Sequence, residues 1–440
     1  MQKRSLARRR ILLLSFTLLG CLSVIYPHIR VPAKWTIVAY VQADNDLSPF
    51  AVYNINNMQL APLGEGINML VQWDQPDNNK TWRYRIVKGG RIEDASLSAE
   101  MGINPVNELV DMMRWAKAKY DAEKFAVILW NHGSGVIDPR YKKIDRFYAI
   151  GMSQLPFKRM VPWLEIPGLE IQSPRGILFD YSQNTYATNQ DLTKAFSRIR
   201  TEVLGKNVAI VGMDACLMAM IEVGLQISNY ADILVGSQET EPGQGWAYSG
   251  FLNALCANPK ATSAQLASFI VSAYGAFYQK NRTPDFTQSA IDLHKLEPLK
   301  KNIISLIASI AACKKADAKN TKSMIVAARK SSLSFEVSDY IDLYTFYAGL
   351  SRQAKALRTS QAKLSRPNTL YIKALDRFIK VVDSGAVLIL DAVVANIAGP
   401  SKSKAKGISI YYPLGAVHRS YPLTLFAKST SWVAFIKEYR

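Results

Sequence analysis

Two residues with complementary chemistry follow two apolar segments of the sequence. His132 lies just beyond residues 125–130, and Cys216 lies just beyond residues 208–213. A cysteine attacks as its thiolate, and a neighbouring imidazole can take the thiol proton or hold the resulting charge. Gly133 follows the histidine, and its unobstructed N–H can donate to a developing oxyanion. The group indicates nucleophilic catalysis, although a lone cysteine after a strand is more often a small apolar core residue.

The elements that must position this pair are those of an α/β fold. Short apolar segments alternate with amphipathic segments from residue 35 onward, which predicts a mostly parallel sheet flanked by helices. The expected strands cover residues 36–41, 67–73, 81–87, 125–130, 208–213 and 231–236. Sites in such sheets lie at the carboxyl ends of strands. We therefore expect His132 and Cys216 to meet at one edge of the sheet.

The pattern of apolar residues divides the chain into regions. Residues 137–190 interrupt the alternation of strands and helices and are predicted to form a long insertion. After about residue 260 the segments become longer and mostly helical, with a strand pair expected at 386–396 and 407–412. We therefore expect a catalytic domain at 31–260 and a C-terminal α+β domain at 261–440.

The N-terminus has the features of an export signal. Five basic residues precede an apolar run at 11–26; they are Lys3, Arg4, Arg8, Arg9 and Arg10. This arrangement is typical of a secretory signal peptide. Cys21 also fits a lipoprotein signal, and an uncleaved membrane anchor is a third reading, although the run is short for a span. In each case we expect residues 31–440 outside the cytoplasm, in the cell envelope or secreted.

Composition narrows the classes of function. A hydrophobic content of 49% indicates a folded chain, and four cysteines cannot form a disulfide framework at this length. The formal net charge of +19 raises nucleic acid, anionic membranes and acidic substrates as partners. The basic runs at 313–322 and 401–406 lack the interleaved aromatic residues that stack on bases, so we expect no nucleic acid partner. The absence of Cys-x-x-Cys and His-x-x-x-His patterns argues against catalytic zinc.

The two segments that carry His132 and Cys216 resemble the clostripain-like cysteine peptidases, relatives of caspases, gingipains and legumains. In that family one apolar strand ends in His-Gly and a later one in Asp-Ala-Cys, as residues 127–133 and 210–216 do here. Further similarity extends along the chain, at residues 35–47, 239–246, 407–413 and 432–435. The resemblance implies a caspase-like fold and a cysteine endopeptidase acting on proteins or peptides.

The resemblance also implies roles for individual residues. His132 would be the general acid and base, Cys216 the nucleophile, and the N–H groups of Gly133 and Cys216 the oxyanion hole. The family cleaves after Arg or Lys, and Asp214 falls on the position of the acid in the S1 pocket. A carboxylate facing a guanidinium is a physically sound reader of arginine. Glu239 and Glu241 are candidates for a second acid.

Three matters stay open at this stage. Family members often mature by internal cleavage, and the 137–190 insertion offers basic sites at Lys142, Lys143, Arg146, Lys158, Arg159 and Arg175. The chemistry requires no cofactor, but some relatives need calcium; Asp44 and Asp46 are acidic turn residues that an ordinary strand end explains equally well. The alternative function is a catalytically silent, protease-like binding protein whose basic charge contacts an anionic surface.

Overall fold

The computed structural model describes residues 32–76, 80–97, 100–138 and 177–440. Pro32–Arg440 forms one compact unit. The expected export signal with Cys21, and the basic residues of the insertion from Lys142 to Arg175, lie outside the described residues. Within the described residues, no helix is both long enough and apolar enough to cross a membrane.

Nine strands of the described chain form one sheet in the order β12-β10-β9-β8-β5-β1-β2-β3-β4. The strands are β1 (Ala33–Gln42), β2 (Ile67–Asp74), β3 (Thr81–Val87), β4 (Gly90–Leu97), β5 (Ala122–Trp130), β8 (Val208–Asp214), β9 (Ala231–Gly236), β10 (Thr287–Asp292) and β12 (Val393–Ala398). The run from β2 to β9 through β1, β5 and β8 is parallel, and the two strands at each edge are antiparallel. The α/β fold with a mostly parallel sheet is therefore confirmed.

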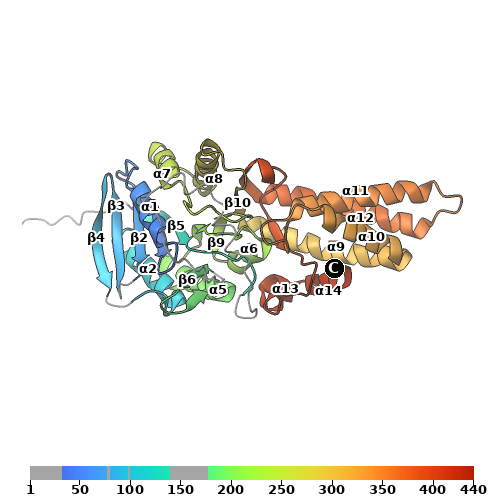
Figure 1. Ribbon diagram of the computed structural model, residues 1–440, viewed down its shortest axis with the longest axis horizontal. Coiled ribbons are helices and arrows are strands. Elements are labelled where there is room, and N and C mark those ends of the chain that lie inside the picture. The colour runs from blue at the N-terminus through green and yellow to red at the C-terminus, as the bar shows by residue number, and fades with distance from the viewer. Residues whose placement is uncertain (1–31, 77–79, 98–99, 139–176) are drawn as a thin grey trace, which may run out of the picture. The chain divides into compact units, whose positions relative to one another are not determined.

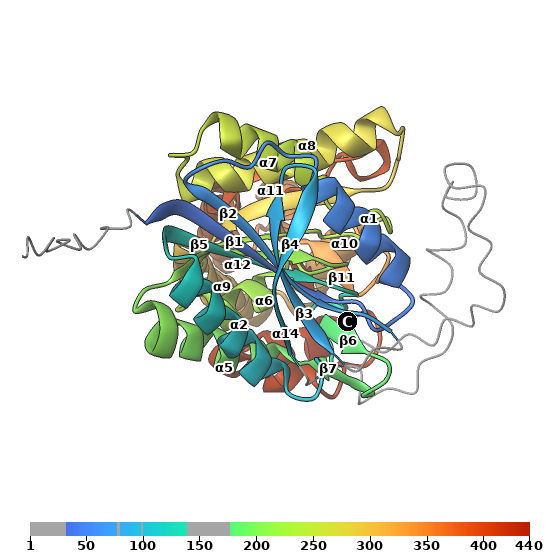
Figure 2. The ribbon, with the colours of Figure 1, turned by 90° about the vertical axis from the view of Figure 1, so that its left-hand side faces the viewer.

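Helices cover both faces of the sheet, as Figures 1 and 2 show. One face carries α1 (Ser48–Met58), α7 (Tyr248–Ala257) and α8 (Ser263–Lys280), and the other carries α2 (Pro105–Lys119), α5 (Asn189–Arg198) and α6 (Ile221–Ile227). Local sequence determines where these helices begin. The Asn104 side chain accepts from the N–H of Asn107 at the start of α2, and Thr262 forms a capping box with Gln265 at the start of α8.

The chain after residue 260 adds to the same sheet. β10 and β12 extend the edge beyond β9, so the expected boundary near residue 260 does not coincide with a break in the sheet. Four long helices lie beyond the β10 side of the sheet in Figure 1. They are α9 (Leu296–Ala316), α10 (Ala318–Ser331), α11 (Leu343–Ala362) and α12 (Thr369–Ala392).

The strand pair expected at 386–396 and 407–412 is wrong. α12 continues to Ala392, because its buried residues keep a helical spacing to that point: Tyr371, Leu375, Phe378, Val382, Gly385, Ile389 and Ala392. β12 then pairs with β10, while β13 (Ser409–Tyr411) pairs with β11 (Tyr340–Asp342). Two further short strands, β6 (Ile177–Asp180) and β7 (Thr185–Ala187), pair with each other. The chain ends in α13 (Leu425–Ser429) and α14 (Trp432–Tyr439).

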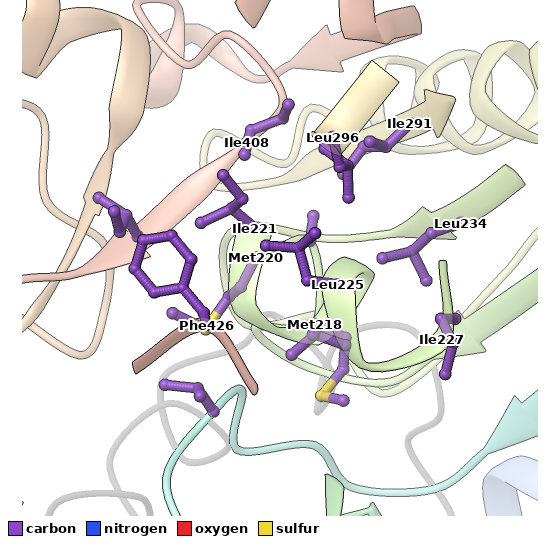
Figure 3. Close-up of a cluster of buried hydrophobic side chains, with 14 of the residues drawn as sticks. Met218, Met220, Ile221, Leu225, Ile227, Leu234, Ile291, Leu296, Ile408 and Phe426 are labelled. Carbon is purple, nitrogen blue, oxygen red and sulfur yellow. The ribbon is translucent and has the colours of Figure 1, made fainter. Parts of the chain in front are cut away.

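The C-terminal segments share a core with the turn that follows β8. Figure 3 shows Met220 and Ile221 near Ile408 and Phe426 in a buried apolar cluster. Gly224 of α6 lets the helices pack closely, since a Cβ there would lie 2.6 Å from Leu296 Cδ1. The C-terminal part therefore supports the segment that carries Cys216.

A buried carboxyl group, that of Glu222, also links α6 to the C-terminal segments. Glu222 of α6 accepts hydrogen bonds from Tyr411 N at 2.9 Å and from the Tyr421 hydroxyl at 2.8 Å. Burial raises the pKa of Glu222 to about 7, because the charged form loses its hydration. The folded protein therefore holds this proton more tightly than the unfolded chain does.

We predict that Glu222→Gln stabilises the protein at pH 8 and has little effect at pH 5. The stability that protonated Glu222 gives is complete below its unfolded pKa and is lost as the pH rises through about 7. Glutamine keeps the neutral form, so the gain at pH 8 should approach roughly 3 kcal/mol. Chemical denaturation at both pH values measures this, with exposed Glu65→Gln as control. An equal effect at both pH values would contradict the assignment.

Candidate active site

The expected pair lies at one edge of the sheet, beyond two adjacent strands. β5 and β8 pair in parallel with Trp130 opposite Asp214, and Asn131 N donates to the Asp214 carbonyl at 3.3 Å. His132 and Cys216 each follow that last register pair by two positions. A Cβ on Gly133 would lie 2.3 Å from the Cys216 carbonyl oxygen and 3.0 Å from its nitrogen. The missing side chain of Gly133 therefore lets the turn after β5 pack directly on the Cys216 backbone.

The His132 ring is held by an acid that the sequence analysis did not assign to the site. Its Nε2 lies 2.7 Å from Asp46 Oδ1, and the Tyr181 hydroxyl donates to the same oxygen at 2.9 Å. Burial opposes the charge of Asp46, but the hydrogen bonds from His132 and Tyr181 outweigh it and lower the pKa of Asp46. An ionised Asp46 can only accept, so Nε2 carries the proton. Asp46 therefore fixes both the orientation and the tautomer of the imidazole.

Cys216 lies in a tight turn that contacts the segment following β9. Its Sγ accepts from Glu241 N at 3.2 Å, and Leu217 N donates to the Glu239 carbonyl at 3.1 Å. Leu217 adopts a positive φ of 65°, a strained conformation for a branched residue. Burial raises the pKa of the Cys216 thiol to about 12, and the nearby acids add to the rise. Within the described residues the His132 ring is bonded to Asp46 rather than to this thiol.

Two carboxyl groups, of the buried Asp214 and the half-buried Glu241, lie next to the thiol. Asp214 Oδ2 accepts from the Tyr248 hydroxyl at 2.8 Å and from Trp246 N at 3.3 Å, and its carboxyl shares a hydrogen bond with Glu241. Burial raises the pKa of both acids, and the charge of Asp214 holds the pKa of Glu241 well above its usual range. Of these two carboxyl groups, Glu241 therefore holds a proton more tightly than Asp214 does. We call Asp214 and Glu241 the acid pair.

Glu239, the other candidate for a second acid, is occupied elsewhere. Lys402 Nζ lies 2.8 Å from its Oε2, and its Oε1 accepts from Thr240 N and Glu336 N at 2.8 and 2.9 Å. The charge of this carboxylate is already balanced by Lys402, so Glu239 is a poor candidate for binding a substrate cation. Of the two glutamates left open by the sequence, the structure places Glu241 beside Asp214.

A second group of acids lies at the ends of β1, β2 and β6. Asp44, Asp74, Glu100 and Asp180 each offer an oxygen, and these oxygens all lie within 4.8 Å of one another. Burial is the main cause that raises the pKa of Asp74 to about 8 and that of Asp180 to about 6, and neighbouring carboxylates add to both. Carboxylate oxygens are the ligands that calcium prefers, so the donor set fits this ion. The sequence showed Asp44 as a turn residue, but gave no sign that four distant segments meet.

Comparison with known proteins agrees with this architecture. The sequence profile of the clostripain family matches residues 39–152 and 165–438. A secreted C11 cysteine protease from Bacteroides thetaiotaomicron, solved with an irreversible peptide inhibitor, superposes with a TM-score of 0.59 at 17% identity, covering 92% of this chain and 99% of that one. An inactive zymogen C11 protease from Parabacteroides distasonis gives 0.56 at 15% identity, covering 91% and 99%. A search of curated protein sequences found no match.

The structural similarities establish a shared fold, and the profile match extends over most of the chain, including both turns of the site. With the α/β sheet and the paired turns after β5 and β8, they lead to one conclusion. The chain belongs to the clostripain family and is a cysteine endopeptidase with protein or peptide substrates.

Proposed function

We propose that this peptidase cleaves after arginine or lysine, with Cys216 as nucleophile and His132 as general acid and base. The observation that carries the proposal is the acid pair, which places buried negative charge next to the thiol. In a buried site an unneutralised carboxylate strongly favours a cationic partner. A P1 guanidinium or ammonium group is the part of a peptide substrate that supplies one.

The reaction divides into acylation and deacylation. The Cys216 sulfur attacks the scissile carbonyl carbon while the thiol proton passes to His132. N–H groups of Gly133 and Cys216 stabilise the oxyanion, and His132 then protonates the leaving amine as the thioester forms. Water, deprotonated by His132, hydrolyses the thioester and releases the acid product. Asp46 stabilises the imidazolium that forms in each half-reaction.

The same acids explain how the thiol is activated. In the free protein the Cys216 thiol stays protonated, because its sulfur is poorly solvated and faces the negative charge of Asp214 and Glu239. A basic P1 side chain that pairs with Asp214 cancels part of this charge and removes one obstacle to the thiolate. The substrate cation thus serves both recognition and activation, which favours basic substrates in the chemical step as well as in binding.

We predict that the preference for a basic P1 residue depends mainly on Asp214. The ionised partner of the acid pair is Asp214, so Asp214→Asn should lower the efficiency toward an arginine substrate by about 10²- to 10⁴-fold. Glu241→Gln keeps a donor to Asp214 and should lose less. The measurement is the ratio of kcat/KM for arginine and norleucine P1 peptides.

Glu239→Gln is the matched control, because it removes a nearby buried acid that pairs with Lys402 instead. Its ratio should stay near that of the unmodified protein. If Asp214→Asn left both efficiencies unchanged, another group would read the P1 side chain. If both efficiencies fell by the same factor, Asp214 would be a structural support of the Cys216 turn.

The proposal extends to export and self-cleavage, which rest on residues 1–30 and on the 137–190 insertion. Expressed in a bacterium, the full chain should appear in the envelope or medium, and palmitate labelling lost in Cys21→Ala would identify a lipoprotein. Self-cleavage within the 137–190 insertion should give two fragments on a denaturing gel, and Cys216→Ala should stay intact. A soluble cytoplasmic product would contradict export, and equal cleavage of Cys216→Ala would contradict self-processing.

The alternative is a catalytically silent, protease-like protein that binds an anionic surface. It would replace the enzyme proposal if the unmodified protein were inactive toward every basic peptide. The structure weakens one of its supports. Lys402, from the basic run at 401–406, pairs with Glu239 beside the site and is only 18% exposed.

A further inference from the structure

The helices α9 to α12 carry many basic residues at the end that lies away from the sheet (Figure 1). α12 leads directly into β12, so the connection between α11 and α12 lies one helix length, about 36 Å for 24 residues, from that strand. In this connection Asn368 Nδ2 donates to the Ala316 carbonyl at 3.1 Å, which brings the junction of α9 and α10 to the same place. We call residues 314–322 and 352–380 the distal end.

The charge of the distal end is almost entirely positive. Its two segments contain twelve lysine and arginine residues and two acids, Asp317 and Asp376. Lys314, Lys355 and Arg358 each lie within ion-pair distance of an acid. The other nine basic residues are exposed, and none forms an ion pair with a residue that the structure describes: Lys315, Lys319, Lys322, Arg352, Lys363, Arg366, Lys373, Arg377 and Lys380.

Two leucines are exposed among these charges. Leu370, at 73%, is the most exposed large apolar side chain of the described residues, and Leu364 is 51% exposed. Leu364 follows the end of α11 by two residues, and Leu370 is the second residue of α12, so both lie at the connection of the two helices. A single exposed leucine is ordinary on a protein surface. Two at the end of a basic group of helices form an amphipathic surface of the kind that binds lipid.

The connection that presents the leucines is fixed to its neighbours. The Asn368 side chain accepts from Tyr371 N at 3.0 Å and so caps α12, while its amide nitrogen holds the end of α9. The Thr321 hydroxyl of α10 lies 3.5 Å from the Tyr371 hydroxyl. Because the surface is already ordered in the free protein, little conformational entropy is lost when it binds.

We propose that the distal end binds the surface of an anionic lipid bilayer. Leu364 and Leu370 insert among the headgroups, and the surrounding lysine and arginine side chains contact the lipid phosphates. The long basic side chains can do this because their aliphatic parts lie against apolar surface while their charged ends stay in water. Attraction to the anionic leaflet and burial of the leucines act together.

The same charge would attract nucleic acid, but the distal end lacks what nucleic acid binding needs. Its aromatic residues, Tyr371 and Phe378, are both fully buried, so neither can stack on a base. Exposed leucines gain nothing from a phosphate backbone, whereas a bilayer offers them an apolar interior. The inference does not depend on the proposed roles of Cys216 and His132, and this contact is separate from attachment through residues 1–30.

Flotation with lipid vesicles tests the proposal on the Pro32–Arg440 chain. This chain is one compact unit that contains every strand and helix described here, and it lacks the apolar run at 11–26 that would itself bind lipid. Cys216→Ala is included so that self-cleavage cannot affect the result. The chain should float with vesicles that contain phosphatidylglycerol but not with vesicles of phosphatidylcholine alone, and added salt should weaken the binding.

Two double variants separate the contributions of charge and of the leucines. Lys363→Gln with Arg366→Gln should lower the partition coefficient by about 25-fold, since each basic group near an anionic surface contributes about fivefold. Leu364→Ser with Leu370→Ser should lower it by about tenfold or more at unchanged charge.

Lys88→Gln with Lys260→Gln is the matched control. It removes the same charge from exposed positions outside these helices, in the β3–β4 turn and before α8, and should change binding by less than about twofold. The Tm should stay the same in all three double variants, because every altered side chain is exposed.

Equal binding to neutral vesicles would overturn the proposal, and so would binding that the variants of the distal end leave unchanged. Binding to nucleic acid without binding to vesicles would overturn it as well and would make nucleic acid the partner. Lipid binding by a chain that proved inactive as a peptidase would leave it intact.

Discussion

A Cβ at residue 133 would lie only 2.3 Å from the carbonyl oxygen of Cys216. The turns after β5 and β8 can therefore pack this closely only because residue 133 is glycine. The parallel register of these strands, with Trp130 opposite Asp214, brings the two turns level. This contact brings the turn that carries His132 against the turn that carries Cys216. The apolar cluster under α6 then holds the Cys216 turn from the C-terminal side.

When no substrate is bound, the acidic groups of this site are in surroundings that disfavour their charged forms. A thiol whose pKa is raised to about 12 adjoins the carboxyl groups of Asp214 and Glu241, and poor solvation disfavours the ionised form of each. Such an arrangement is stable as long as protons remain on the sulfur and on Glu241. The basic P1 side chain of the proposed substrates would change that balance, because it would bring a positive charge next to Asp214.

The sequence predicted the central parts of this arrangement because they depend on local patterns. Apolar segments of strand length located the six expected strands, and the residues just beyond two of them located His132 and Cys216. The partners were harder to predict, since they depend on contacts between distant segments. Asp46 was visible only as a turn residue, and Glu239 and Glu241 could not be told apart until Lys402 was seen to pair with Glu239. The end of α12 was mistaken for a strand because its aliphatic residues suggested one, although their spacing is helical.

The central claim is that Cys216 is a nucleophile that a neighbouring cation activates. The most direct measurement compares the rates at which two reagents label this thiol at pH 7.5, by peptide mass spectrometry. One is an arginyl acyloxymethyl ketone, and the other is iodoacetamide, which carries no charge. The account predicts rapid labelling of Cys216 by the arginyl reagent, slow labelling by iodoacetamide, and loss of the difference in Asp214→Asn. Equal rates with both reagents would contradict it, and so would labelling of Cys256, a half-buried free cysteine of α7, in place of Cys216.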